Sequence, residues 1–181
     1  MVLKNISPNP ESPIFRISTL VFLRDERQRL LLLHRSKPPN CKKWSPVGGK
    51  LDICTGESPF ECAIRETHEE TGFVVDESDL HLFSCVSEKN YENAGHWLMF
   101  LFSCRKPLPF LPQAGPEGEF GFFDRSSIES VAIPCSDKLL IWPLYDKFAE
   151  EGFVAVRADC TISDKPDIKI EEQFHLLNEE S

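Results

Sequence analysis

Three glutamates and an arginine stand close together in the sequence and could hold a divalent metal ion. Glu66, Glu69 and Glu70 are spaced i, i+3 and i+4, so on a helix they project from one side, with Arg65 beside them. Carboxylates held ~5 Å apart repel by roughly 3 kcal/mol per pair in a partly screened environment, so a cation should join them. Their oxygens suit Mg²⁺ or Mn²⁺. The spacing alone leaves open a simply solvated acidic helix face.

The segment that carries these glutamates is predicted to be a helix that begins at Ser58 and ends at Gly72. Ser58 is a hydroxyl N-cap, Pro59 suits the first helical position, and Glu61 completes a capping box. Gly72 can take the left-handed conformation that ends a helix. At about 100° per residue, one stripe should pack on the domain: Phe60, Ala63, Ile64, Thr67 and Thr71.

This helix and the glycine-rich loop before it resemble the Nudix box. That box is a glycine, a spaced glutamate and then R-E-apolar-x-E-E-x-G-apolar, and the spacing from Glu57 through Arg65 to Gly72 matches it residue for residue. The chain departs from the family twice: seven residues separate Gly49 from Glu57, two more than usual, and Thr67 replaces a bulky aliphatic residue. A longer loop costs little closure entropy, so we expect an altered loop and an intact metal face.

The resemblance implies an α+β fold, the Nudix α/β/α sandwich with a mixed β-sheet between helices, over roughly residues 15–158. It also implies hydrolysis of a diphosphate linked to another moiety, usually a nucleoside, by water that attacks phosphorus. Mg²⁺ would be the cofactor, and Mn²⁺ could substitute for it.

The family's metal ligands map onto Glu66, Glu69 and Glu70, and the backbone carbonyl of Gly49 would add an oxygen. Many members add a glutamate from the loop before a late strand. Glu117 and Glu119 both lie in that place, and the spacing does not choose between them.

The resemblance gives Glu57 and Arg65 a supporting role, in which they pair and orient the ligating side chains. The alternative is a surface salt bridge worth under ~1 kcal/mol. With Glu66 and Glu69, this pair makes up the predicted catalytic set.

Substrate contacts are less specific in the sequence. Lys50 could touch a phosphate. Asp137 lies where nucleotide-hydrolysing members of the family often place a polar residue that reads the base edge, although it could simply favour a helix N-terminus. Aromatic side chains could stack on a base, although aromatics at strand ends are more often core. These candidates are Trp44, Tyr91, His96 and Trp97.

Three functions remain open. The run Lys43–Lys50 resembles MutT-like enzymes, so a nucleoside triphosphate or an oxidised purine nucleotide is the favoured substrate. Tyr91 lies where dinucleoside polyphosphate hydrolases of the family carry a tyrosine. A Nudix scaffold that binds a nucleotide without catalysis is the third, although the complete R-E-x-x-E-E opposes it.

The composition limits the classes of partner that we expect the protein to bind. The net charge of −9 disfavours a surface that embraces long nucleic acid, so a small nucleotide is the expected partner of a monomer or homodimer. Seven cysteines without a C-x-x-C pair disfavour disulfides and zinc, and Cys62 is expected to pack and not to act as a nucleophile. No apolar run is long enough to span a bilayer, and the N-terminus lacks a signal-peptide pattern; we expect a soluble cytoplasmic protein.

The chain is predicted to be one domain over residues 14–160, with a flexible proline-rich leader over 1–13 and an acidic tail over 161–181. A hairpin should join strands 15–23 and 30–34. Further strand segments are predicted at 74–75, 80–86, 97–102 and 121–124. A helix over about 136–150, strained at Pro143, should precede a last strand at 153–157.

Overall fold

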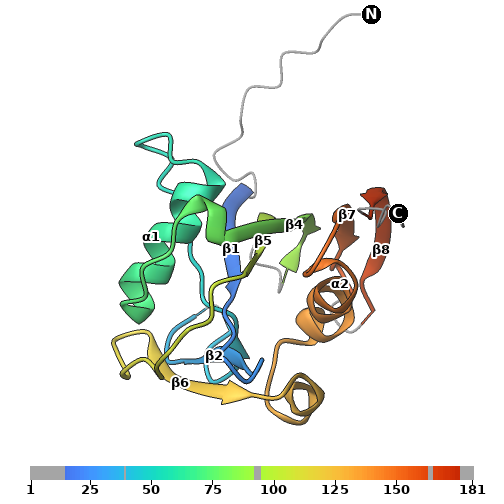
Figure 1. Cartoon of the computed structure of the whole chain (residues 1–181). Helices are drawn as coiled ribbons and strands as arrows, with labels where there is room; N and C mark the ends of the chain where they lie inside the picture. The colour runs from blue at the N-terminus through green and yellow to red at the C-terminus, as the bar shows by residue number, and fades with distance from the viewer. Residues whose placement is uncertain (1–14, 39, 92–94, 163–164, 176–181) are drawn as a thin grey trace, which may run out of the picture.

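The computed structural model describes residues 15–38, 40–91, 95–162 and 165–175, which form two β-sheets with helices packed around them (Figure 1). The leader expected over residues 1–13 lies outside the described residues. The larger sheet has the order β1-β5-β4-β7-β8. Its strands are β1 (Phe15–Phe22), β4 (Leu80–Lys89), β5 (His96–Cys104), β7 (Phe153–Asp159) and β8 (Asp167–Phe174).

The larger sheet is mixed. β1 pairs with β5, and β4 with β7, in parallel, whereas β4 pairs with β5, and β7 with β8, antiparallel. An α+β arrangement with a mixed sheet between helices is therefore confirmed.

The smaller sheet has the order β3-β2-β6, and it overturns the predicted N-terminal hairpin. Its strands are β2 (Leu30–Arg35), β3 (Trp44–Ser45) and β6 (Gly118–Phe123). The chain does reverse after β1, but only one isolated bridge, between Arg24 and Leu30, joins the two arms. β1 pairs instead with the distant β5, because both strands bury apolar side chains on two faces.

α1 (Pro59–Thr71) has the predicted caps. The Ser58 hydroxyl accepts the Glu61 N–H at 3.2 Å, the Glu61 carboxylate accepts the Ser58 N–H at 2.7 Å, and Gly72 is left-handed with φ 73°. Ala63 is buried in one hydrophobic cluster with Val21 and Phe102. The helix is thus anchored by its apolar face.

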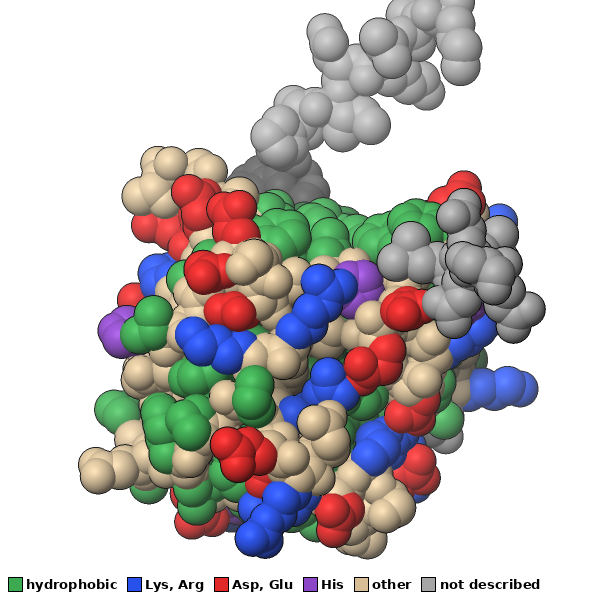
Figure 2. All heavy atoms as spheres, in the orientation of Figure 1, with side chains coloured by type: hydrophobic (Ala, Val, Ile, Leu, Met, Phe, Trp, Pro, Cys, Tyr) green, Lys and Arg blue, Asp and Glu red, His purple; other side chains and the backbone are tan. Residues whose placement is uncertain are grey.

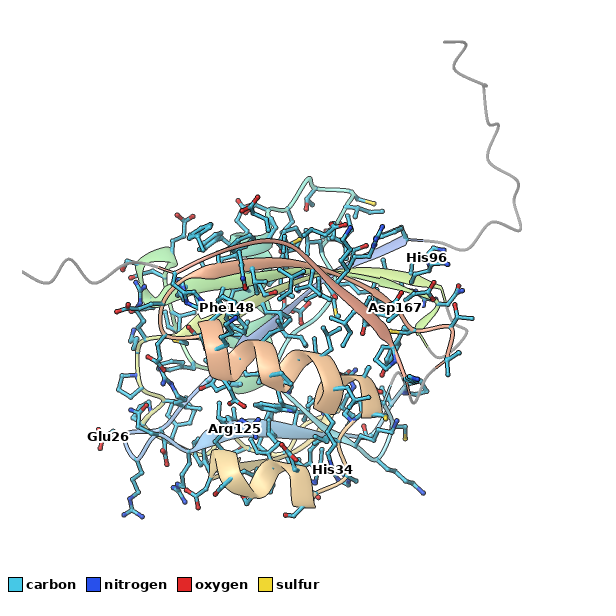
Figure 3. The ribbon with its side chains drawn as sticks, turned by 90° about the vertical axis from the view of Figure 1, so that its right-hand side faces the viewer. Glu26, His34, His96, Arg125, Phe148 and Asp167 are labelled. Carbon is cyan, nitrogen blue, oxygen red and sulfur yellow. The ribbon has the colours of Figure 1, made fainter. Side chains whose placement is uncertain are left out.

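The second predicted helix is divided. A single π-helical turn, η4 (Asp137–Ile141), precedes α2 (Trp142–Phe148), and Pro143 stands in the first turn of α2. The strain expected at Pro143 is therefore absent, and the irregularity is the wide turn that precedes this residue. Arg125 lies beside α2, pairs with Asp146 at 2.6 Å and stands 5.0 Å from the Trp142 ring (Figure 3).

α1 and α2 cover opposite faces of the larger sheet. Val21 and Phe102 belong to the cluster on the α1 side, whereas their chain neighbours Phe22 and Leu101 belong to the cluster that contains α2. Strand alternation therefore separates two cores.

Two strand predictions were wrong. Val74 and Val75 are not in a strand, since they follow the Gly72 turn directly. Residues 153–157 are not the last strand either, because β8 adds an exposed edge within the predicted acidic tail. Its Ile168 and Ile170 alternate with charged residues, a pattern that the acidity of the segment concealed. No helix in the described part of the chain combines the length and apolar character needed to cross a bilayer.

We predict that Phe22→Ala lowers the free energy of unfolding by about 3–5 kcal/mol, because the ring is fully buried against Phe83, Trp142 and Tyr145. Phe15→Ala, on the same strand but 52 % exposed, should cost under about 1 kcal/mol. Urea denaturation of both variants measures the difference. Equal losses would contradict this description of the core.

Candidate functional site

Arg65 connects the loop before α1 to the acidic side of that helix. Its Nε and Nη2 donate to the two carboxylate oxygens of Glu57 at 2.6 and 2.9 Å. Its Nη1 donates to Glu66 Oε1 at 2.7 Å and to Glu69 Oε2 at 3.0 Å. One guanidinium thus fixes three carboxylates, and the pairing expected between Arg65 and Glu57 is present.

Glu57 is the most enclosed member of this network. The Arg65 guanidinium holds the pKa of Glu57 down at about 2, against the opposing effect of burial, and the Asp52 N–H also donates to it at 2.8 Å. The carboxylate therefore stays ionised and ties the lengthened loop to α1. Acidic side chains gather over this loop and the start of α1 (Figure 2).

The glycine pair lies directly against the helix. The Gly48 N–H donates to Glu70 Oε2 at 3.3 Å, and the Gly49 carbonyl accepts the Thr19 N–H at 2.9 Å. A methyl group on Gly49 would lie 2.2 Å from the Glu66 carboxylate. Glycine is needed here because the backbone and that carboxylate approach so closely.

Burial raises the pKa of two carboxylates on this side of α1. The pKa of Glu70 rises to about 7, mainly by burial, with repulsion from Glu66 and Glu117 adding to it. The pKa of Glu66 also rises, mainly by burial, although Arg65 opposes the shift. These groups are costly to ionise without a further positive charge nearby.

These side chains line a cleft between α1 and the loop before β6. Glu66, Glu69 and Glu70 share it with Glu117 and with the glycine pair. Glu119 lies elsewhere, opposite His34 in the smaller sheet, with 3.3 Å between His34 Nδ1 and its Oε1. The geometry thus favours Glu117, which also pairs with Lys37 at 2.8 Å.

The donor set of the cleft fits a hard divalent ion. Carboxylates with raised pKa values and a close backbone carbonyl are typical of such sites. Within the described residues, however, no three carboxylate, histidine or cysteine side chains already converge on one point. Arg65 holds Glu66 and Glu69, so ion binding would require these side chains to turn from the guanidinium.

A second cavity adjoins the cleft and shares with it Arg35, Gly48, Gly49 and Lys50. Three of the predicted substrate contacts, Tyr91, Trp97 and Asp137, line this cavity, and Lys50 lies at the junction. Trp44 does not line it, since its ring packs against His34 and Phe123 at 4.8 Å each. His96 is not among the lining residues of either hollow.

Sequence reasoning missed several residues that line the cavity. Arg35 ends β2, Asn40 accepts a hydrogen bond of 2.7 Å from the Tyr91 hydroxyl, and Glu88 is buried on β4. No local signal separates Glu88 from an exposed strand residue. Arg35 could have been noticed as a cation that follows an apolar strand and precedes a proline-rich loop.

The cysteines lack disulfide bonds, as expected. Burial, together with Glu57 and Glu66, raises the pKa of the Cys62 thiol to about 11, so the thiol remains protonated at neutral pH. Cys62 is fully buried, which agrees with a packing role.

Gly49→Ala should weaken Mn²⁺ binding about tenfold or more, because the added methyl displaces the Glu66 carboxylate. Calorimetric titration with Mn²⁺ measures the affinity. Gly115→Ala is the control, since that glycine lines the same cleft but an added methyl meets no atom within 4 Å. Unchanged affinity in Gly49→Ala would exclude Glu66 as a ligand.

Glu70→Gln should stabilise the metal-free protein above pH 7. The folded pKa of about 7 exceeds the ordinary value of 4.5, so the wild type loses stability as pH rises through this interval, whereas glutamine does not ionise. Thermal melting in chelator from pH 4.5 to 8 should show an advantage of the variant that grows with pH. A pH-independent difference would contradict the burial of this charge.

Comparisons with known proteins identify the family and the fold of the chain. The NUDIX domain family matches residues 14–142. A MutT protein from Bacillus halodurans superimposes with a TM-score of 0.67 at 21% identity, covering 86% of this chain and 97% of its own. A MutT protein from Methanosarcina mazei Go1 gives 0.62 at 24% identity, with 78% and 97% covered.

A third structure is the NUDIX domain of Shewanella oneidensis NrtR in complex with ADP ribose. It superimposes with a TM-score of 0.59 at 16% identity, covering 79% of this chain and 93% of its own. At such identities these likenesses show the fold alone, and they confirm the expected Nudix fold. Since the family match spans most of the chain and includes the whole of α1, the chain belongs to the Nudix hydrolase family.

Proposed function

We propose that this protein hydrolyses a diphosphate bond in a nucleoside diphosphate-linked compound, with a nucleoside triphosphate or an oxidised purine nucleotide as substrate. The observation that carries the proposal is the junction of two unlike hollows. The carboxylate cleft and the aromatic cavity meet at Arg35 and the backbone of residues 48–50. A molecule with an anionic chain at one end and a flat ring at the other fits both.

The acidic side of α1 faces the phosphate end of such a molecule. Glu66, Glu69 and Glu70, with Glu117, would hold Mg²⁺, or Mn²⁺ in its place. The bound ion would neutralise the diphosphate and lower the pKa of an attacking water. The substrate needs the ion in order to bind, because the anionic substrate and the carboxylates of the cleft repel each other when no cation lies between them.

The chain's own residues supply position and proton transfer. Arg65 and Glu57 orient the ligating side chains, because their two hydrogen bonds hold the loop before α1 in place. A carboxylate of the cleft that does not ligate the ion would accept the proton of the attacking water. Arg35 and Lys50 line the junction, where they can contact the phosphates.

Dinucleoside polyphosphate hydrolysis is a second candidate. Tyr91, the residue that raised it, lines the cavity, and its hydroxyl donates to Asn40. That hydrogen bond is equally compatible with either substrate class. A direct assay must therefore separate the two.

The assay is release of phosphate or pyrophosphate from a panel of nucleoside triphosphates, oxidised purine nucleotides, dinucleoside polyphosphates and nucleotide sugars. Each compound is tested with Mg²⁺, with Mn²⁺ and with chelator. Metal-dependent cleavage of one class names the substrate. If the folded, metal-loaded protein cleaves none of these compounds, the proposed hydrolase activity is refuted. A scaffold that binds nucleotides without cleaving them is then favoured.

Glu69→Gln should keep the fold and lower kcat by about a hundredfold or more, because the exposed side chain contributes little to packing but offers a charged ligand. Its melting temperature should stay near that of the wild type. Glu129→Gln, an exposed carboxylate far along the chain, serves as the control. A nearly normal rate in Glu69→Gln would remove this residue from the metal site.

A further inference from the structure

The two edges of the larger sheet differ in what lies along them. At the β1 edge the glycine loop supplies partners: the Thr19 N–H donates to the Gly49 carbonyl at 2.9 Å, and the Val21 N–H donates to the Val47 carbonyl at 2.7 Å. At the other edge, β8 pairs with β7, and among the described residues no further strand pairs with it (Figure 1). The N–H and C=O groups on the outer side of β8 can therefore bind another strand.

None of the eight side chains of β8 is buried, although three of them are large and apolar. Ile168 is 39 %, Ile170 46 % and Phe174 53 % exposed. Many edge strands are protected from pairing by proline or by very short length, and β8 has neither protection. A bulge at Glu171 and the charged side chains are the features that could oppose pairing. The placement of those charges therefore decides what the edge can bind.

The register with β7 divides the side chains of β8 between the two faces of the sheet. Ile168 and Ile170 project on the side of α2, because the residues opposite them in β7 belong to the core on that side. Lys169 lies opposite Arg157 and projects on the other side. Glu171 shares that side, since it pairs with Arg157 at 3.7 Å. One face of β8 thus carries isoleucines and the other carries opposite charges two residues apart.

This order of side chains favours pairing with a second copy of the same strand in antiparallel orientation. When two copies meet about a two-fold axis at Ile170, Lys169 of each copy lies opposite Glu171 of the partner subunit. The two Ile170 side chains then lie opposite each other, and each Ile168 is diagonally adjacent to them. A parallel pairing in register would instead place lysine against lysine and glutamate against glutamate, which is destabilising.

We propose that β8 is the interface of a homodimer, in which two copies pair their β8 strands antiparallel about Ile170 and form one continuous sheet. Lys169, which makes no ion pair with any other described residue, gains Glu171 of the partner subunit as its counter-ion. The interface is short, so a dissociation constant of roughly 10–100 µM is expected.

The interface is separate from the candidate site. β8 lies beyond the residues 14–142 that the family match covers, and none of its residues lines the carboxylate cleft or the aromatic cavity. The inference therefore does not rest on the proposed function, and either of the two can fail without the other.

Sedimentation velocity of the full-length chain measures the association. The wild type should change from monomer to dimer between about 1 and 500 µM. Lys169→Glu and Glu171→Lys should each weaken the dimer about tenfold or more, because each change places like charges opposite one another twice. Arg27→Glu is the matched control for Lys169→Glu: it makes the same change in net charge at an exposed turn between β1 and β2, and it should dimerise as the wild type does.

An equimolar mixture of the two charge variants tests the pairing itself. In the mixed dimer both contacts again join opposite charges, so the mixture should associate about tenfold or more tightly than either variant alone. An effect of these charges on folding, or an interface elsewhere on the surface, would not produce this recovery. If both variants keep the melting temperature of the wild type and the mixture shows no recovery, the inference is overturned.

Hydrogen exchange of the wild type is an independent measurement that requires no variant to fold. The amides of β8 should exchange several-fold more slowly at about 500 µM than at about 5 µM, whereas those of β1 should not change. A chain that stays monomeric at about 500 µM overturns the inference and leaves the β8 edge to a strand of a different protein. A dimer in which exchange along β8 is not slowed overturns it as well.

Discussion

Arg65 bridges the loop before α1 to the acidic side of the helix, and the site depends on this bridge. Without a guanidinium among them, Glu57, Glu66 and Glu69 would repel one another across a partly buried surface. The planar fork of arginine allows it to meet Glu57 through two bonds and the helix carboxylates through a third nitrogen. A lysine would supply the charge without the geometry.

Strand β1 holds the glycine loop that the two hollows of the site share. Thr19 of β1 donates its N–H to the Gly49 carbonyl, and its side chain lies near Cys62 of α1. Its neighbours Ser18 and Leu20 line the aromatic cavity together with it. Bridges from Ser18 to Lys50 and from Val21 to Val47 hold the glycine loop along this strand. One strand thus fixes the loop at the junction of the two hollows.

The parts of the fold that local chemistry determines could be predicted from the sequence. The caps of α1 are contacts between residues three or four positions apart, so the residue types at Ser58, Glu61 and Gly72 were enough to predict them. Strand pairing is not local: β1 and β2 are each apolar runs, and nothing in either run says that β1 joins a strand some seventy residues later. The chain order alone does not decide whether Glu117 or Glu119 reaches the cleft: Glu119 is paired with His34 inside β6, whereas Glu117 precedes the strand, in the loop that lines the cleft.

The residues of the site fall into the same two groups: those that local spacing predicts and those that only tertiary packing places. The carboxylates of α1 were predictable because helical spacing alone brings them together, and the family resemblance added their roles. Trp44 and Trp97 are both tryptophans that begin short apolar segments, yet only tertiary packing sends the former against Phe123 and the latter to the cavity. Glu88 could not be recognised from the sequence, because its polar neighbours Ser87 and Lys89 make the segment resemble the solvated end of a strand.

The wide turn at residues 137–141 makes the cavity adjustable by a change in chain length. In a π-helical turn the Trp142 N–H bonds to the Asp137 carbonyl five positions back, one more than in an α-helix. Deleting one residue from this turn would restore the α-helical ladder and rotate the preceding residues by about 100° around the axis. Asp137 would then leave the cavity while α2 kept its packing. A single codon lost or gained here can therefore change what the cavity accepts and leave the sheet, the glycine loop and the carboxylates untouched.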